Sequence, residues 1–217
     1  MFTVGIVGHS LTPRELDIAG ISVRVFRKPG ATWADINCRE FSGFWQSRFD
    51  LGIVVLGGND LALVDHREAL GRAQEFIDRV SSCCSVVKVC TVEPRFYSVD
   101  NRFGVIQGRY NRERNAYNRT LKRILRRRGI SSVDIGTPWL AFERFRDGVH
   151  FNDRASRSLE RKLGRIIIAE RNSEGSFCLR RCCVCIVILV FFCQKGLVCF
   201  SFCVSRVEND EFRSIRP

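Results

Sequence analysis

The chain has 217 residues, of which 45% are hydrophobic and 27% are charged, a balance that belongs to one globular domain, with or without an appendage, rather than to a disordered protein. The formal net charge of +12 comes mostly from arginine and favours an anionic partner such as nucleic acid or a membrane surface, although charge alone does not indicate an activity. Seven of the 11 cysteines lie within 178–203, and the apolar stretch 1–7 lacks a basic preamble, so we expect a reduced, cytoplasmic body without a secretory signal.

The first two predicted strands each end at a glycine. An apolar run begins at the N-terminus and ends at Gly8, and Ser10 follows two residues later. The sequence Thr12–Glu15 then combines a capping residue, a proline and a glutamate, which predicts a short helix directly after the serine. Ile21–Phe26 alternates apolar and polar residues and predicts a second strand, which leads to Gly30.

The middle of the chain predicts a buried central strand between two helices. Apolar residues at helical spacing after the capping residue Thr32 indicate a helix that leads into Asp50. The next run, Leu51–Leu56, is apolar throughout, which is typical of a parallel strand covered on both faces. A helix over Arg67–Val80 and a fourth strand over Ser85–Thr91 follow.

The rest of the body repeats this alternation once more. Glu93–Gly108 shows no sustained period and predicts a loop, and Tyr110–Arg128 predicts a helix. Ser131–Ile135 predicts a short fifth strand, and Asn152 can cap a last helix with residues 155, 159, 163 and 166 on its inner side. Five alternations of strand and helix predict a three-layer α/β/α sandwich around a mostly parallel five-stranded sheet.

The composition changes after residue 170. We therefore expect a body over 1–170 and a cysteine-rich tail over 171–217, joined through the polar stretch 171–176. The segment 182–204 is apolar apart from four residues and is a candidate membrane anchor, because a span needs about 20 apolar residues. Two alternatives to an anchor remain for this tail: an apolar extension that associates with other surfaces, or an artefact of translated non-coding DNA.

Four places at predicted strand ends or in the last loop carry groups suited to acyl transfer. Ser10 can act as a nucleophile only if a base takes its proton, and His150 has a carboxylate, Asp147, three residues before it. The carboxylate can orient the imidazole and stabilise the imidazolium. The backbone N–H groups of Ser10 and Gly30 and the side-chain amide of Asn59 are candidate oxyanion donors.

These positions resemble the four blocks of the SGNH (GDSL-type) hydrolases, in the family's order. The blocks read Gly-His-Ser-Leu at 8–11, Gly30, Gly-Gly-Asn-Asp at 57–60 and Asp-Gly-Val-His at 147–150, within a resemblance that covers roughly 2–168. It implies a flavodoxin-like fold and ester hydrolysis through a serine acyl-enzyme, without a cofactor. The first block departs at His9, where the family usually has an aspartate that is not the triad acid. A Gly-His-Ser block is also similar to the SGNH-like domains of animal retroelement-derived proteins.

The short predicted connections and the lack of a recognisable lid favour a small ester substrate, such as an acetyl ester. His9 and His66 are expected to be surface or loop histidines, because the body has no cysteine or carboxylate cluster with metal-ligand spacing. Asp60 is expected to be structural. No metal site and no phosphate-binding loop are predicted.

The stretch Arg109–Arg128 holds nine basic residues and one acid, Glu113. Such a run is usually the solvated outer face of a helix. Alternatively, it contacts phosphates, and the chain is then a catalytically weak or inactive module that binds nucleic acid.

Overall fold

The computed structural model describes residues 1–96, 106–135 and 144–194, with side chains described as far as residue 173. The chain divides into two units, 1–171 and 172–217. The strands are β1 (Phe2–Gly8), β2 (Ile21–Arg27), β3 (Phe49–Val55), β4 (Cys84–Cys90) and β5 (Ser131–Val133). The helices are the 3-10 helix η1 (Trp33–Asn37) and the α-helices α1 (Arg39–Trp45), α2 (Asp60–Leu63), α3 (His66–Cys83), α4 (Gln107–Arg127) and α5 (Asp153–Gln194).

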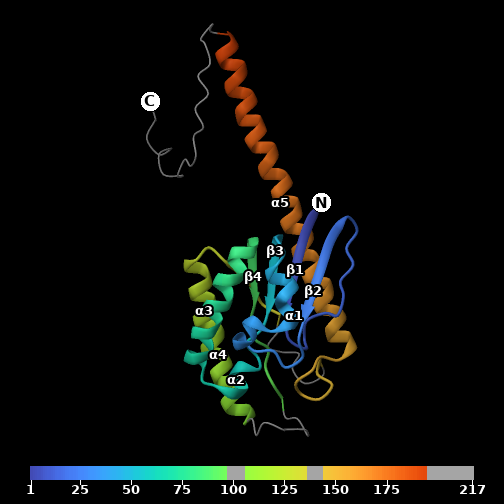
Figure 1. Ribbon diagram of the computed structural model, residues 1–217, viewed down its shortest axis with the longest axis vertical. Coiled ribbons are helices and arrows are strands. Elements are labelled where there is room, and N and C mark those ends of the chain that lie inside the picture. The colour runs from blue at the N-terminus through green and yellow to red at the C-terminus, as the bar shows by residue number, and fades with distance from the viewer. Residues whose placement is uncertain (97–105, 136–143, 195–217) are drawn as a thin grey trace. The chain divides into compact units, whose positions relative to one another are not determined.

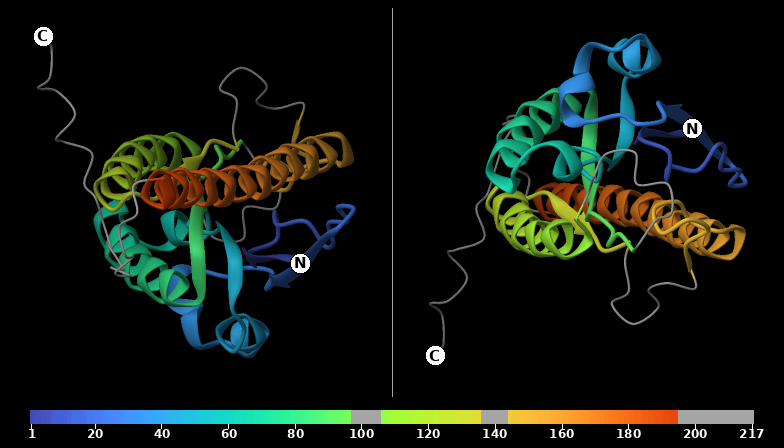
Figure 2. Two further views of the ribbon diagram at one scale, coloured as in Figure 1. Left: turned by 90° about the horizontal axis from the view of Figure 1, so that it is seen from above. Right: turned by 90° about the horizontal axis from the view of Figure 1, so that it is seen from below.

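The five strands form one parallel sheet in the order β2-β1-β3-β4-β5. This order is that of the flavodoxin-like doubly wound fold, in which ligands bind at the carboxyl ends of the strands. Helices α1, α3 and α4 cover one face of the sheet, and the first part of α5 covers the other (Figures 1 and 2). The predicted three-layer sandwich is therefore confirmed.

Alternating side chains of the strands fill two cores. On one face, aromatic residues of η1, α1 and α3 pack against the sheet, including Trp33, Phe44 and Phe76. On the other face, aliphatic residues of β1 and β3 pack against Leu159 and Leu163 of α5. Burial on both faces explains why β3 is apolar along its whole length.

The helix predicted directly after Ser10 is absent, and residues 9–20 are irregular apart from turns. The Thr12 N–H donates to the His9 carbonyl oxygen (3.0 Å), which closes a turn instead of starting a helix. The Thr12 side chain is buried, and its Oγ1 has no hydrogen-bond partner among the described residues, whereas a capping oxygen would accept from the first turn. Tertiary packing thus overrides the local capping signal.

The helix predicted after Thr32 is broken into η1 and α1 at Cys38, whose backbone is extended (φ −68°, ψ 152°). On α5, Ile167 is fully buried in place of the predicted Ile166, which is only partly buried.

Helix α5 continues to Gln194, so the predicted polar linker at 171–176 is helical. No helix in the part of the chain described with side chains is long and apolar enough to cross a membrane. The candidate anchor at 182–204 lies outside that part.

Candidate active site

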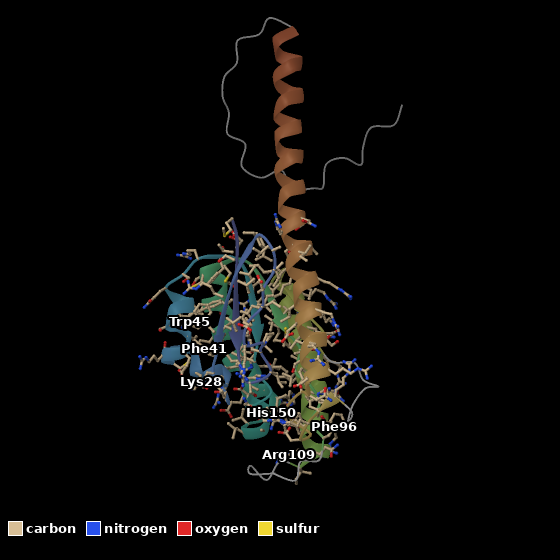
Figure 3. The ribbon with its side chains drawn as sticks, turned by 90° about the vertical axis from the view of Figure 1, so that its right-hand side faces the viewer. Lys28, Phe41, Trp45, Phe96, Arg109 and His150 are labelled. Carbon is tan, nitrogen blue, oxygen red and sulfur yellow. The ribbon has the colours of Figure 1, made fainter. Side chains whose placement is uncertain are left out.

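A cavity opens at the carboxyl end of the sheet and brings two of the predicted site residues together. Ser10 follows β1, and Asn59 follows β3, and both side chains line this cavity. The turn after β1, the segment after β4 and the last loop also contribute to its wall, through His9, Leu11, Glu93, Pro94, Arg95 and Val149. Lys28, Phe96, Arg109 and His150 lie toward the same end of the sheet (Figure 3).

The turn after β1 is fixed by hydrogen bonds on both sides of Ser10. The His9 N–H donates to the Val55 carbonyl oxygen (3.1 Å), which anchors the turn to the end of β3. The Arg27 guanidinium donates to the Ser10 carbonyl oxygen (2.8 Å) from the end of β2. Two neighbouring strands therefore hold the serine backbone in place.

Asp147 and His150 form a paired unit in the last loop. The His150 Nδ1 lies 2.7 Å from the Asp147 Oδ2, and the backbone N–H groups of His150 and Val149 donate to Oδ1 (2.6 and 3.0 Å). Burial acts to raise the pKa of Asp147, but these hydrogen bonds outweigh it and hold the pKa at about 2. The carboxylate is therefore ionised at neutral pH and accepts the Nδ1–H of the imidazole.

His150 is half-exposed (42% for the side chain), with Val149 next to it in the cavity wall. No hydrogen bond joins the Ser10 hydroxyl to His150 among the described contacts. In serine hydrolases this contact is often long before substrate binds.

The three candidate oxyanion donors each retain a free hydrogen with respect to the described residues. The backbone N–H groups of Ser10 and Gly30 make no hydrogen bond there, and only one hydrogen of the Asn59 amide is used, toward the Ala31 carbonyl oxygen (2.9 Å). Gly30 is exposed, has φ +76° and does not line the cavity itself. The next residue, Ala31, accepts the hydrogen bond from the Asn59 amide, so Gly30 is one residue away from that contact.

Gly57 shapes the turn that presents Asn59. Its φ of +103° lies in a region that favours glycine, and an added Cβ would lie 2.9 Å from Val92 Cγ2 and 3.1 Å from Trp33 Nε1. The neighbouring Asp60 is fully buried and accepts from the Trp33 N–H, which agrees with its expected structural role.

His9, predicted as a surface or loop histidine, lies in the turn after β1 but is buried. It is 7% exposed and lines the cavity, and its Nδ1 accepts the Leu11 N–H (3.2 Å). Burial, together with the positive charges of Arg95 and Arg27, lowers its pKa to about 3. The ring is therefore neutral at pH 7, with the proton on Nε2. His66, in contrast, is partly exposed and pairs with Glu113 of α4.

Sequence reasoning missed the contribution of the segment after β4. Arg95 Nη2 donates to both the Gly58 carbonyl oxygen and the Asn59 Oδ1, each at 3.0 Å, and Glu93 lines the same cavity. The end of β4 is itself a strand end, so the rule that singled out Ser10 and Asn59 could also have found these two residues.

Glu93 is a buried acid beside the catalytic candidates. It is 7% exposed, and its Oε1 has no hydrogen-bond partner among the described residues. Burial raises its pKa to about 7 against the opposing charges of Arg114, Lys162 and Arg144. Among the described residues, no group of three or more His, Cys, Asp or Glu side chains could hold a metal ion.

Comparison with solved structures shows the same fold in ester hydrolases. An aryl esterase from M. smegmatis is 16% identical and covers 78% of this chain and 99% of its own, with a TM-score of 0.60. A carbohydrate acetylesterase family member from Sinorhizobium meliloti is 15% identical over 78% of this chain and 99% of its own, with a TM-score of 0.63. A GDSL-like lipase from Bacteroides thetaiotaomicron is 16% identical over 77% and 88%, with a TM-score of 0.59.

The expected SGNH-type fold is therefore confirmed. No family model matches the sequence, and no curated protein matches it.

Proposed function

We propose that the chain is a serine ester hydrolase that cleaves a small ester through an acyl-enzyme. Ser10 Oγ attacks the ester carbonyl carbon as His150 takes its proton, and Asp147 stabilises the resulting imidazolium. The N–H groups of Ser10 and Gly30 and the Asn59 amide hold the oxyanion. Collapse of the tetrahedral intermediate expels the alcohol, which receives the proton from His150, and water then hydrolyses the acyl-enzyme by the same steps.

One observation carries this proposal. The Asp147–His150 pair, with its 2.7 Å contact, belongs to the loop whose Val149 lines the cavity that holds Ser10 and Asn59. Three loops therefore meet at one cavity: the turn after β1 with Ser10, the turn after β3 with Asn59, and the loop that carries the Asp147–His150 pair. This arrangement supports a nucleophile, an oriented base and oxyanion donors that act on one substrate. The fold shared with esterases and lipases adds support at the level of fold.

The direct test compares the purified full chain with Ser10→Ala on p-nitrophenyl acetate and with a fluorophosphonate label. We expect ester hydrolysis and labelling in the wild type and neither in the variant. His150→Ala should label slowly if the serine is activated by the base. Equal hydrolysis rates for the wild type and Ser10→Ala would rule out the proposed function.

A second candidate function, nucleic-acid binding, is favoured by the outer surface of α4. Five exposed arginines lie on the side of the helix opposite its buried residues: Arg109, Arg112, Arg119, Arg123 and Arg126. None of them pairs with a described acidic residue, because Glu113 is used by His66 and Asp134 by Lys122. An uncompensated row of arginines suits a chain of phosphates.

Helix α5 carries a second row. Helices α4 and α5 cover opposite faces of the sheet and both reach its β5 edge, where Lys122 and Lys162 bond to Asp134. Four exposed arginines follow the outer side of α5 at helical spacing: Arg154, Arg157, Arg161 and Arg165. The resemblance of the first block to retroelement-derived domains agrees with this second function.

The test measures binding of single-stranded RNA and duplex DNA over a range of salt concentrations. Neutralising Arg119 and Arg123 to Gln should weaken binding and reduce its salt dependence, whereas the same change at Arg39 and Arg67, which are exposed elsewhere, should not. Binding that is absent, or equally weak in both variants, would exclude this function.

A further inference from the structure

The guanidinium of Arg95 contacts the oxyanion-hole asparagine from a segment outside the four sequence blocks. We propose that Arg95 is a positioning residue that fixes the side-chain amide of Asn59 with its N–H₂ group toward the substrate oxyanion. This inference rests on the proposed function for its catalytic consequence. Its structural part, the orientation of the amide, stands independently.

Hydrogen-bond chemistry gives the Asn59 amide one orientation only. Arg95 Nη2 can only donate, and it contacts Asn59 Oδ1 at 3.0 Å. The Ala31 carbonyl oxygen can only accept, and it contacts Asn59 Nδ2 at 2.9 Å. Turning the amide by 180° would set two donors against each other on one side and two acceptors on the other. The second hydrogen of Nδ2 therefore remains available for an oxyanion.

The same guanidinium group also holds the backbone that carries the asparagine. Arg95 Nη2 donates to the Gly58 carbonyl oxygen (3.0 Å), which also accepts from the Tyr110 hydroxyl (3.2 Å). The Arg95 Cζ lies 4.8 Å from the centroid of the Tyr110 ring, a cation–π contact that fixes the plane of the guanidinium. Both the side chain of Asn59 and the peptide before it are therefore held by one group.

Helix α4 holds Arg95 itself in place through its backbone. Asn111 accepts from the Arg95 N–H (3.1 Å) and donates to the Arg95 carbonyl oxygen (2.8 Å). Seven residues later on the same helix, Asn118 makes the same pair of bonds to Val92, both at 2.9 Å. These two asparagines bind the segment after β4 as a neighbouring strand would. Arg95 is thus presented by a rigid support, as preorganised catalysis requires.

The catalytic test is a double-mutant cycle with p-nitrophenyl acetate. Arg95→Met removes the donor while keeping most of the side-chain length, and Asn59→Ala removes the oxyanion donor. We expect Asn59→Ala to lower kcat by about 10² to 10³ and Arg95→Met to lower it by on the order of tenfold with little change in KM. In the Asn59→Ala background, Arg95→Met should cause no further loss.

Two results of the cycle would overturn the proposal: an equal loss of kcat from Arg95→Met in both backgrounds, or a raised KM with unchanged kcat. Arg67→Met is the matched control, because it removes one exposed arginine of α3 that lies outside the proposed catalytic and nucleic-acid-binding residues, and it should leave kcat unchanged. Thermal unfolding of each variant separates loss of orientation from loss of folding.

A second measurement does not depend on turnover. The Asn59 side-chain amide, identified by its absence from the spectrum of Asn59→Ala, should exchange its protons slowly in the wild type and faster in Arg95→Met. Equal exchange in the two proteins would overturn the positioning role. A wild type that is inert to esters and fluorophosphonate but shows this difference would refute the proposed function and support the role of Arg95.

Discussion

Both oxygens of the Asp147 carboxylate are used by His150: Oδ2 contacts the ring Nδ1 at 2.7 Å, and Oδ1 accepts the backbone N–H at 2.6 Å. The acid therefore fixes the imidazole relative to the backbone of the same turn. Because the Nδ1 position carries the proton, Nε2 is the atom that can accept a proton from a serine.

Asp147→Asn should abolish most of the proposed esterase activity while leaving the fold intact. An asparagine can present its N–H₂ group to Nδ1, which stabilises the wrong tautomer, so we expect kcat to fall by about 10³ to 10⁴. Because the pKa of Asp147 is about 2, this loss should be the same from pH 6 to pH 9. Asp153→Asn, an exposed change at the start of α5, serves as the control in the p-nitrophenyl acetate assay.

Gly57→Ala should destabilise the protein because two costs add at this turn. The φ of +103° strains an alanine backbone, and its Cβ would lie 2.9 Å from Val92 Cγ2. We expect the free energy of unfolding to fall by about 2 to 4 kcal/mol in urea denaturation. Gly71→Ala is the opposite case, since it lies in α3 with open space around it and should stabilise the protein by about 0.5 to 1 kcal/mol. Equal effects of the two changes would contradict this explanation.

His9→Asn should remove part of the acid sensitivity of folding. The pKa of His9 is about 3 in the folded state, below the 6.5 of an ordinary histidine, so the unfolded chain binds more protons between these values. Stability from this group is therefore present above pH 6.5 and is lost as the pH falls.

Between pH 7 and pH 4.5 the wild type should lose about 2 to 3 kcal/mol of unfolding free energy more than His9→Asn. The asparagine Oδ1 can still accept the Leu11 N–H, so the turn is kept. Urea denaturation at the two pH values measures the difference, and parallel losses in the two proteins would contradict it.

The sequence was sufficient to predict the sheet and the candidate residues that follow its strands. The run over β3 is unbroken because both of its faces are buried, and the position of Asn59 follows directly from the end of that strand. The spacing of Asp147 and His150 is local, so their pairing could also be anticipated. These features depend on periodicity and on short-range geometry.

The remaining features depend on contacts between distant segments. Arg95 meets Asn59 only because two asparagines of α4 hold the segment after β4, and that segment has no period in the sequence. His9 is buried by neighbours from other loops, with Gly58 close to its ring, and a single polar residue carries no local signal of this. The prediction of a helix starting at Thr12 was wrong for the same reason, since the Thr12 side chain is buried by distant segments and does not cap a helix.

Glu93→Gln should change the pH dependence of stability in the direction opposite to His9→Asn. The pKa of Glu93 is about 7 in the folded state, above the 4.5 of an ordinary glutamate, so the folded protein binds more protons between these values. Stability from the protonated acid is therefore present below pH 4.5 and is lost as the pH rises through 7.

Between pH 4.5 and pH 8 the wild type should lose about 3 kcal/mol of unfolding free energy relative to Glu93→Gln. Over pH 4.5–7 the contributions of His9 and Glu93 oppose each other, so the wild type itself should show a flatter profile than either variant. Urea denaturation of the two variants, with the exposed Glu75→Gln as the control, tests this cancellation. If Glu93→Gln follows the wild-type profile, the buried carboxyl is not the group that titrates near neutral pH.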